Sequence, residues 1–157
     1  MGYLTVITVG SLKEKYLIAA KDEYKKRLGA YTRVEEIELK EEKISNEDDK
    51  KEIERALECE ADRILAAIPK GAMTVALAVE GKQYSSEELA RLIGGAESGK
   101  VCLIIGSSHG MSERVKRAAD VRLSFSRLTF PHQLMRVILF EALYRSHTIL
   151  AGKRYHK

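Results

Sequence analysis

The sequence has 157 residues, of which 45% are hydrophobic and 32% charged, a composition typical of one soluble globular domain that can bury its own core. No apolar run approaches the roughly 18 residues needed to cross a bilayer, and the first residues lack the pattern of a signal peptide. These features exclude a membrane-spanning protein and predict a single cytoplasmic domain over residues 1–157, with no membrane partner.

The two cysteines, Cys59 and Cys102, lie far apart, without the spacing of a zinc motif and without a cluster of histidines. We therefore expect reduced thiols and no metal site. Cys102 lies inside an apolar strand pattern, which disfavours a catalytic thiol.

The net charge of +4 conceals an uneven distribution of charge along the chain. Residues 35–60 hold 12 acidic and 5 basic residues, a balance of −7, whereas residues 113–157 hold 10 basic and 3 acidic residues, a balance of +7. A basic C-terminal third predicts a surface that faces a polyanion, and RNA is the first candidate. A solvated basic surface without a partner is the alternative.

The N-terminal part of the chain predicts a strand, a helix and a second strand. The β-branched run 4–9 is continuous, as in a strand buried on both faces, and apolar residues then recur at helical spacing from Leu12 to Leu28. Gly29 is a typical helix stop. Residues 34–39 alternate imperfectly, which indicates a strand nearer the edge of the sheet.

A charged segment and a long helix follow. The stretch 40–45 predicts a mobile loop. Ser45 with Asp48 resembles a capping box, so we expect the helix to begin there. Its apolar stripe continues to Ile68, and residues 69–71 end it.

The second half repeats the alternation of strand and helix. The runs 73–79 and 101–105 predict apolar strands, and Ser85 with Glu88 predicts a capped short helix between them. A short helix at 112–119 and a short strand at 121–124 follow. A long helix then opens at Pro131 and reaches about His147. This order predicts an α/β fold with a mainly parallel sheet and helices on both faces.

Three predicted strand exits carry candidate ligand-binding residues, because open α/β sheets bind ligands beyond the carboxyl ends of their strands. The exits are residues 77–81, 106–110 and 124–131. Gly106 lets backbone amides approach a ligand closely, and a branched side chain there would occupy space that the ligand needs. The second exit lacks the Gly-Lys-Ser/Thr of a P-loop and the spacing of a dinucleotide site, so alone it predicts no more than a turn.

Polar residues mark one face of the last helix and the end of the chain. Those on the helix are His132, Arg136, Tyr144 and His147. The tail from Gly152 to Lys157 combines basic side chains, an aromatic ring and an imidazole, a mixture that binds and stacks on unpaired RNA bases. An exposed polar face and a frayed basic end are the alternatives, and Glu141 with Arg145 fits a simple helix ion pair.

The longest informative segments are 9–16, 23–28, 103–106, 123–137, 141–145 and 155–157. Together they resemble the RlmH family, the ribosomal RNA large subunit methyltransferase H, from end to end. The runs Thr129-Phe130-Pro131-His132 and Tyr155-His156-Lys157 are its most specific motifs. One departure is Ser107, where the family's motif has a second glycine. Backbone contacts survive there if residue 107 does not need a positive φ.

The resemblance implies a SPOUT-type fold with a C-terminal trefoil knot, a feature otherwise nearly absent from proteins. It implies S-adenosylmethionine as cofactor and N3 of a pseudouridine in 23S ribosomal RNA as the methyl acceptor. It also implies a homodimer whose site is completed across the interface, for which the apolar side of the last helix is the candidate. The partners would be ribosomal RNA or the ribosome.

Residue roles follow from the same resemblance. The implied cofactor contacts are Leu77, Gly106, Phe125, Ser126, Arg127, Leu128, Thr129 and Phe130. The candidate catalytic residues are His132, Arg136, Tyr155 and His156, and the candidate RNA contacts are Arg154 and Lys157. The acceptor N3–H is a weak acid, so a basic pocket that stabilises its anion, and a group that takes the proton, would promote transfer. The sequence does not identify that group.

Two other functions fit the sequence. A non-catalytic nucleotide- or RNA-binding α/β module would explain the strand exits and the basic tail without a methyl donor. An RNA methyltransferase with a different target, on a ribose hydroxyl or another base, would need the same cofactor.

Overall fold

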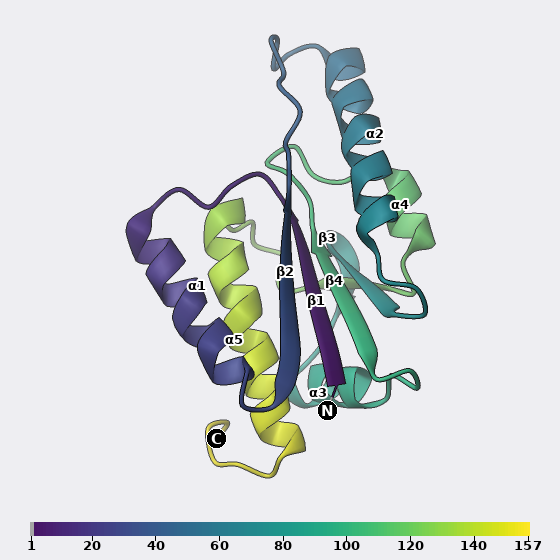
Figure 1. Ribbon diagram of the computed structural model, residues 1–157. Coiled ribbons are helices and arrows are strands. Elements are labelled where there is room, and N and C mark those ends of the chain that lie inside the picture. Colours follow the sequence, from purple (N-terminus) through teal and green to yellow (C-terminus); the bar gives the residue numbers. More distant parts are fainter. Residues whose placement is uncertain (1) are drawn as a thin grey trace.

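The computed structural model describes residues 2–157, which fold around one five-stranded sheet (Figure 1). The strands are β1 (Gly2–Val9), β2 (Thr32–Leu39), β3 (Met73–Gln83), β4 (Lys100–Ile105) and β5 (Val121–Ser124). The helices are α1 (Lys15–Leu28), α2 (Lys50–Ala67), α3 (Ser86–Gly94), α4 (Glu113–Ala118) and α5 (His132–Leu150). All pairings between these strands are parallel, which confirms the predicted α/β class. The C-terminal knot stays a prediction.

The strand order is β2-β1-β4-β3-β5. β2 lies at an edge, as its imperfect alternation predicted. β3 lies between β4 and β5, so the carboxyl ends of these three strands are neighbours. This placement brings the three predicted strand exits to one edge of the sheet.

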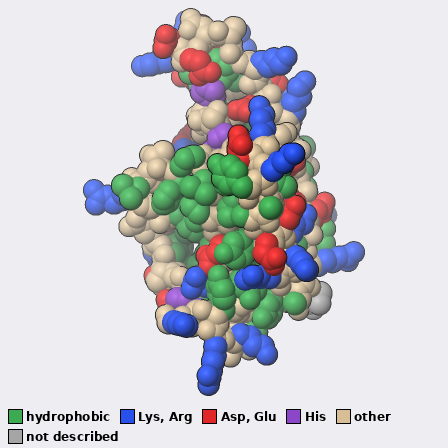
Figure 2. Space-filling model, turned by 90° about the vertical axis from the view of Figure 1, so that its left-hand side faces the viewer, with side chains coloured by type: hydrophobic (Ala, Val, Ile, Leu, Met, Phe, Trp, Pro, Cys, Tyr) green, Lys and Arg blue, Asp and Glu red, His purple; other side chains and the backbone are tan. Residues whose placement is uncertain are grey.

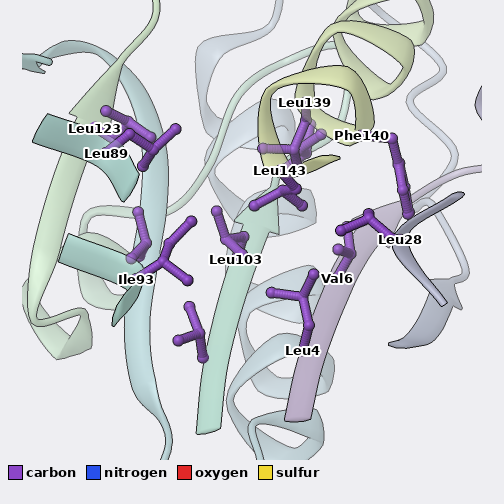
Figure 3. Packing of buried hydrophobic residues seen from close by; sticks show 13 residues of the cluster. Leu4, Val6, Leu28, Leu89, Ile93, Leu103, Leu123, Leu139, Phe140 and Leu143 are labelled. Carbon is purple, nitrogen blue, oxygen red and sulfur yellow. The ribbon is translucent and has the colours of Figure 1, made fainter. Parts of the chain in front are cut away.

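Helices cover both faces of the sheet and enclose two apolar clusters. One cluster joins the sheet to α1, α3 and α5, and Figure 3 shows Leu139 and Leu143 of α5 near Leu103 of β4. The other joins the opposite face to α2 and α4. Successive residues of a strand point to opposite faces, so both faces of β4 are apolar, as its sequence predicted. Cys102 is fully buried, and burial raises the pKa of its thiol to about 12, which leaves it unreactive at neutral pH.

The start of α2 differs from the prediction. Its N-cap is Asp49, whose carboxylate accepts hydrogen bonds from the backbone of Lys51 at 3.0 Å and Glu52 at 3.3 Å. The hydroxyl of Ser45 instead donates to the Glu52 carboxylate at 2.7 Å. The predicted Ser45 capping box is therefore wrong, because Asp49 lies nearer the first turn. The box of Ser85 and Glu88 on α3 is confirmed.

β3 is longer than predicted and contains an irregularity near its end. Its pairing with Leu123 shifts from Leu77 to Lys82, so residues 78–81 bulge out of the ladder. A Cβ at Gly81 would lie 2.7 Å from the backbone of Arg122, so this close approach requires glycine. The bulge displaces part of the first strand exit away from the sheet.

Candidate functional site

A cavity of about 280 Å³ lies where β3, β4 and β5 end. Residues of the three predicted exits line it, within the segments 77–80, 105–111 and 123–130. Lys116, His132 and Met135 complete the wall. The sheet therefore brings together the three segments that the sequence singled out.

The Gly106 exit forms a tight loop held by its own backbone. The Ser107 amide donates to the Gly110 carbonyl at 3.0 Å, and the Gly110 amide returns a bond to the Ser107 carbonyl at 2.9 Å. A Cβ at Gly106 would lie 2.3 Å from that Gly110 oxygen. Glycine is therefore required by the loop itself. The first clash is inside the loop, and because Gly106 also lines the cavity, the expectation that a branched side chain here would fill ligand space stays a prediction.

Ser107 fits the loop without strain. Among residues 2–157 positive φ angles occur only at glycines, so residue 107 does not need the left-handed region. Its side chain is buried beside the loop. The departure from the family motif therefore leaves the backbone geometry intact.

The third exit is shaped by two serine turns. The Ser124 hydroxyl donates to the Ser126 carbonyl at 3.1 Å, and the Ser126 hydroxyl accepts from the Leu128 amide at 2.9 Å. Leu128 is 73% exposed although it lines the cavity, and Val79 on the β3 bulge is 58% exposed. These two side chains leave apolar surface for a ligand to cover.

The predicted cofactor contacts are nearly all at the cavity. Seven of the eight line it: Leu77, Gly106, Phe125, Ser126, Leu128, Thr129 and Phe130. Arg127 belongs to the same turn but is not part of the wall. Their roles as cofactor contacts stay predictions.

The sequence missed an ion pair at the cavity. Lys116 Nζ lies 2.5 Å from Glu80 Oε1, and this contact lowers the pKa of the Glu80 carboxyl. The Lys116 side chain is 17% exposed. Glu80 belongs to the first exit, 77–81, but no spacing in the sequence links it to a lysine on α4.

His132 begins α5 and lies in the cavity wall. Burial, and secondly the nearby charge of Arg136, lower the pKa of its imidazole. His132 is therefore neutral at neutral pH and has a nitrogen free to accept a proton.

Arg136 lies outside the cavity wall and is fully buried. Its Nη1 donates to Glu38 Oε2 at 2.8 Å, and its Nη2 donates to the carbonyls of Val9 at 3.1 Å and Gly10 at 2.7 Å. These contacts tie α5 to the ends of β1 and β2. Because of these contacts, the Arg136 guanidinium does not reach the cavity directly, as its predicted catalytic role would require. The contacts fit instead a residue that holds His132 in place.

The tail residues lie against the C-terminal half of α5, away from the cavity. Tyr155 Oη donates to Glu141 Oε1 at 3.1 Å. His156 lies between Arg145 and Glu87, and Arg154 and Lys157 are exposed. Glu141 follows Met135, the nearest cavity residue on α5, by six positions, about 9 Å at ~1.5 Å per residue. Figure 1 shows the start of α5 and the C-terminus at opposite ends of this helix.

The surface on which the tail rests is formed by three tyrosines and two arginines: Tyr24, Tyr31, Tyr144, Arg27 and Arg145. The Tyr155 ring meets Tyr144 edge-on, with centroids 4.6 Å apart, and Tyr144 also adjoins Tyr24 and Tyr31 at 6.2 Å each. Arg145 lies 4.9 Å from the Tyr155 centroid. The Glu141–Arg145 pair, read from the sequence as a simple helix ion pair, thus also holds the tail.

Within residues 2–157 no helix is long and apolar enough to span a bilayer. Nor do the described residues contain a group of three or more histidine, cysteine or carboxylate side chains placed to hold a metal ion.

Comparisons with known proteins cover nearly the whole chain. The family model described as "Predicted SPOUT methyltransferase" matches residues 3–156. Proteins named ribosomal RNA large subunit methyltransferase H are similar throughout. The one from Caldicellulosiruptor bescii is 47% identical over 98% of this chain and 99% of its own. The one from Shouchella clausii is 45% identical over the same shares.

The fold also resembles a solved structure. The SpoU methyltransferase AviRb from Streptomyces viridochromogenes, crystallised in complex with its cofactor AdoMet, aligns with a TM-score of 0.50 and 13% identity. The alignment covers 98% of this chain and 60% of that chain. This likeness concerns the fold alone.

Proposed function

The chain belongs to the ribosomal RNA large subunit methyltransferase H family of SPOUT methyltransferases, and on that premise we propose that it transfers a methyl group from S-adenosylmethionine to large-subunit ribosomal RNA. The observation that carries the proposal is the cavity at the adjoining ends of β3, β4 and β5. We propose N3 of a pseudouridine in the 23S ribosomal RNA as the acceptor, which the family resemblance implies.

The cavity suits the proposed cofactor in size and surface. Its volume of about 280 Å³ is near the lower end of the ~300–1,000 Å³ typical of small-molecule sites. The exposed apolar surfaces of Val79 and Leu128 are available to cover an adenine ring, and the Gly106 loop offers backbone groups to its edge. When bound, S-adenosylmethionine supplies a methyl group activated by a sulfonium.

The protein's part in the reaction is to position the acceptor and to remove its proton. The uracil-like N3–H must be lost for nitrogen to act as a nucleophile. His132 is neutral at neutral pH and lies in the cavity wall, so it is our candidate proton acceptor. Arg136 would keep His132 in place through its bonds to Glu38 and to the end of β1.

We propose that a second copy of the chain supplies the tail to this cavity. Within one chain, the first tail contact on α5, at Glu141, lies six residues beyond Met135, the nearest cavity residue on that helix. Figure 2 shows hydrophobic side chains gathered on the side where α1 and α5 lie, with Lys and Arg side chains around them. On these helices Tyr16 is 71% and Leu134 38% exposed, as expected of surface that a symmetric partner covers. Arg154 and Lys157 would then hold RNA phosphate while Tyr155 and His156 contact the target base.

Calorimetry and nucleoside analysis test the proposal. The purified protein should bind S-adenosylmethionine and S-adenosylhomocysteine. If the folded protein binds neither detectably at millimolar concentration, the proposed methyltransferase activity is excluded. Mass spectrometry of ribosomal RNA from cells with and without the gene should show loss of one N3-methylpseudouridine. Loss of a ribose or other base methylation would indicate a different target, and no change together with RNA binding would indicate a non-catalytic module.

A further inference from the structure

The imidazole of His156 is bonded on both ring nitrogens. Its Nδ1 lies 3.1 Å from Arg145 Nη1, and its Nε2 lies 2.7 Å from Glu87 Oε1. The tail, α5 and the first turn of α3 thus meet at one ring. Glu87 is 69 residues from His156 in the sequence and belongs to none of the strand exits.

The partners of the two nitrogens determine where the proton lies. An arginine guanidinium can only donate hydrogen bonds, so Nδ1 must be the unprotonated acceptor. Nε2 therefore carries the hydrogen and donates it to the Glu87 carboxylate, which can only accept. The network selects one of the two neutral forms of His156. The contact with His156 also lowers the pKa of the Glu87 carboxyl.

Arg145 is itself fixed from the other side. Its Nε and Nη2 donate to Glu141 Oε1 at 3.0 and 2.6 Å, and the same carboxylate oxygen accepts from Tyr155 Oη. The guanidinium also lies against the Tyr155 ring. Glu87 is the one member of this network that lies on α3, so it joins the tail to an element that the Tyr155 contacts do not reach.

We propose that Glu87 is a positioning residue that orders the C-terminal tail by holding His156 as its Nε2–H tautomer. The proposal rests on the proposed role of the tail in binding the target base. A tail fixed before RNA arrives loses less conformational freedom on binding, and its imidazole keeps one orientation in every complex.

A surface ion pair without a positioning role would affect neither the tautomer of His156 nor the methylation rate. The Glu87 side chain is 52% exposed, and pairs so exposed contribute little to stability. Removing Glu87 should therefore leave the melting temperature nearly unchanged. Its effect should appear in the tautomer of His156 and in the methylation rate.

The experiment compares Glu87→Ala and Glu87→Gln with Glu97→Ala in the full-length protein labelled with ¹⁵N-histidine. Glu97 is an exposed carboxylate after α3 that makes no ion pair among the described contacts, so it is the matched control. Long-range ¹H–¹⁵N spectra at pH 8 should show His156 protonated at Nε2 in the wild type and in Glu97→Ala. The signal should become a mixture of tautomers in Glu87→Ala. Glu87→Gln, whose amide oxygen still accepts, should restore the wild-type form.

Turnover provides the second readout. We expect Glu87→Ala to lower kcat for RNA methylation about tenfold, less than the ~100-fold that a 1 Å misplacement can cost. Cofactor affinity should be unchanged, and Glu87→Gln should recover most of the rate. A wild-type His156 protonated at Nδ1, an unchanged spectrum in Glu87→Ala, or a changed spectrum with unchanged kcat would overturn the proposal. Absence of methylation by the wild type would count against the proposed function alone, because the spectra would still decide whether Glu87 orders the tail.

Discussion

The two ends of α5 meet two surfaces of opposite chemical character. At its start lies the cavity, whose wall is made of backbone, small residues and apolar side chains, with Glu80, Lys116 and His132 as its charged or titratable groups. Towards its end lies the tail surface, built from clustered tyrosines, two arginines and carboxylates. The first surface suits a ligand recognised by shape and backbone bonds, the second one recognised by charge and stacking.

The difference fits the proposed division of labour between two chains. A rigid helix of 19 residues, about 28 Å at ~1.5 Å per residue, connects the two surfaces. Neither surface alone provides both the proposed cofactor site and the proposed RNA contacts. A two-fold partner would bring the tail surface of one chain to the cavity of the other.

Removal of residues 155–157 should have the largest effect on the tail side. Without Tyr155 and His156 the target base loses its proposed contacts, so we expect methylation to fall by at least about 10³-fold, within the range that positioning supplies. S-adenosylmethionine affinity by calorimetry should stay within about twofold, since the tail lies away from the cavity of its own chain. Deleting Lys157 alone is the control and should cost far less. A large loss of cofactor affinity on truncation would contradict the separation of the two surfaces.

A substitution at His132 tests the cavity side. If this imidazole accepts the N3 proton, His132→Gln should lower kcat about 10²-fold, the low end for general base catalysis. The pKa of His132 is lowered by burial and Arg136, so the wild-type rate should fall only below about pH 6.5, the ordinary histidine value. That acid limb should disappear in His132→Gln. A pH profile that is the same in both proteins would exclude His132 as the base.

Gly106→Ala should act on cofactor binding and spare the tail. The new Cβ would lie 2.3 Å from the Gly110 oxygen, so the loop must open. We expect the Kd for S-adenosylmethionine to rise about tenfold, or ~1.4 kcal/mol. His109→Ala, in the same loop but outside the cavity wall, is the control. Unchanged cofactor affinity in a folded Gly106→Ala protein would show that this loop is not part of the cofactor site.

The smallest effect concerns stability at the other end of α5. Burial lowers the pKa of His147, whose Nδ1 donates to the Leu143 carbonyl at 2.8 Å. The unfolded chain then binds protons at a higher pH than the folded chain, so stability is retained above about pH 6.5 and falls as the pH drops below it. His147→Gln should weaken this pH dependence, measured by denaturant unfolding between pH 5 and 8, without changing kcat. If the pH dependence of stability is the same in His147→Gln and in the wild type, groups other than His147 cause it.

Local sequence signals sufficed for most elements and for the cavity. Continuous apolar runs predicted strands buried on both faces, and the Ser85–Glu88 box located α3, because these signals depend on neighbouring residues. Parallel strand ends then placed Leu77, Gly106 and Phe125 together. The first residue of α2 was not predicted correctly because residues 45–49 contain several side chains that can cap a helix. In the structure the Ser45 hydroxyl donates to the Glu52 carboxylate, and Asp49 caps the helix by accepting from the Glu52 amide.

The contacts that sequence could not supply are side-chain pairs between distant elements. Arg136 looked like a surface residue because its partner Glu38 lies 98 residues away across the sheet. The Glu80–Lys116 and Glu87–His156 pairs likewise form only once α3 and α4 have packed on the sheet. No periodicity encodes such pairs, since each depends on how two elements pack.

The central claim is that a working site joins the cavity of one chain to the tail of another, and mixed dimers test it most directly. A chain lacking residues 155–157 is mixed with a full-length Gly106→Val chain, whose branched side chain should abolish cofactor binding where alanine only weakens it. Each chain should be inactive as a homodimer, and heterodimers are isolated with two affinity tags. The Gly106→Val chain has an intact tail, and the truncated chain has an intact cavity. We predict that methylation returns to as much as about half the wild-type level, because one of the two composite sites is complete. No recovery in verified heterodimers would contradict the account.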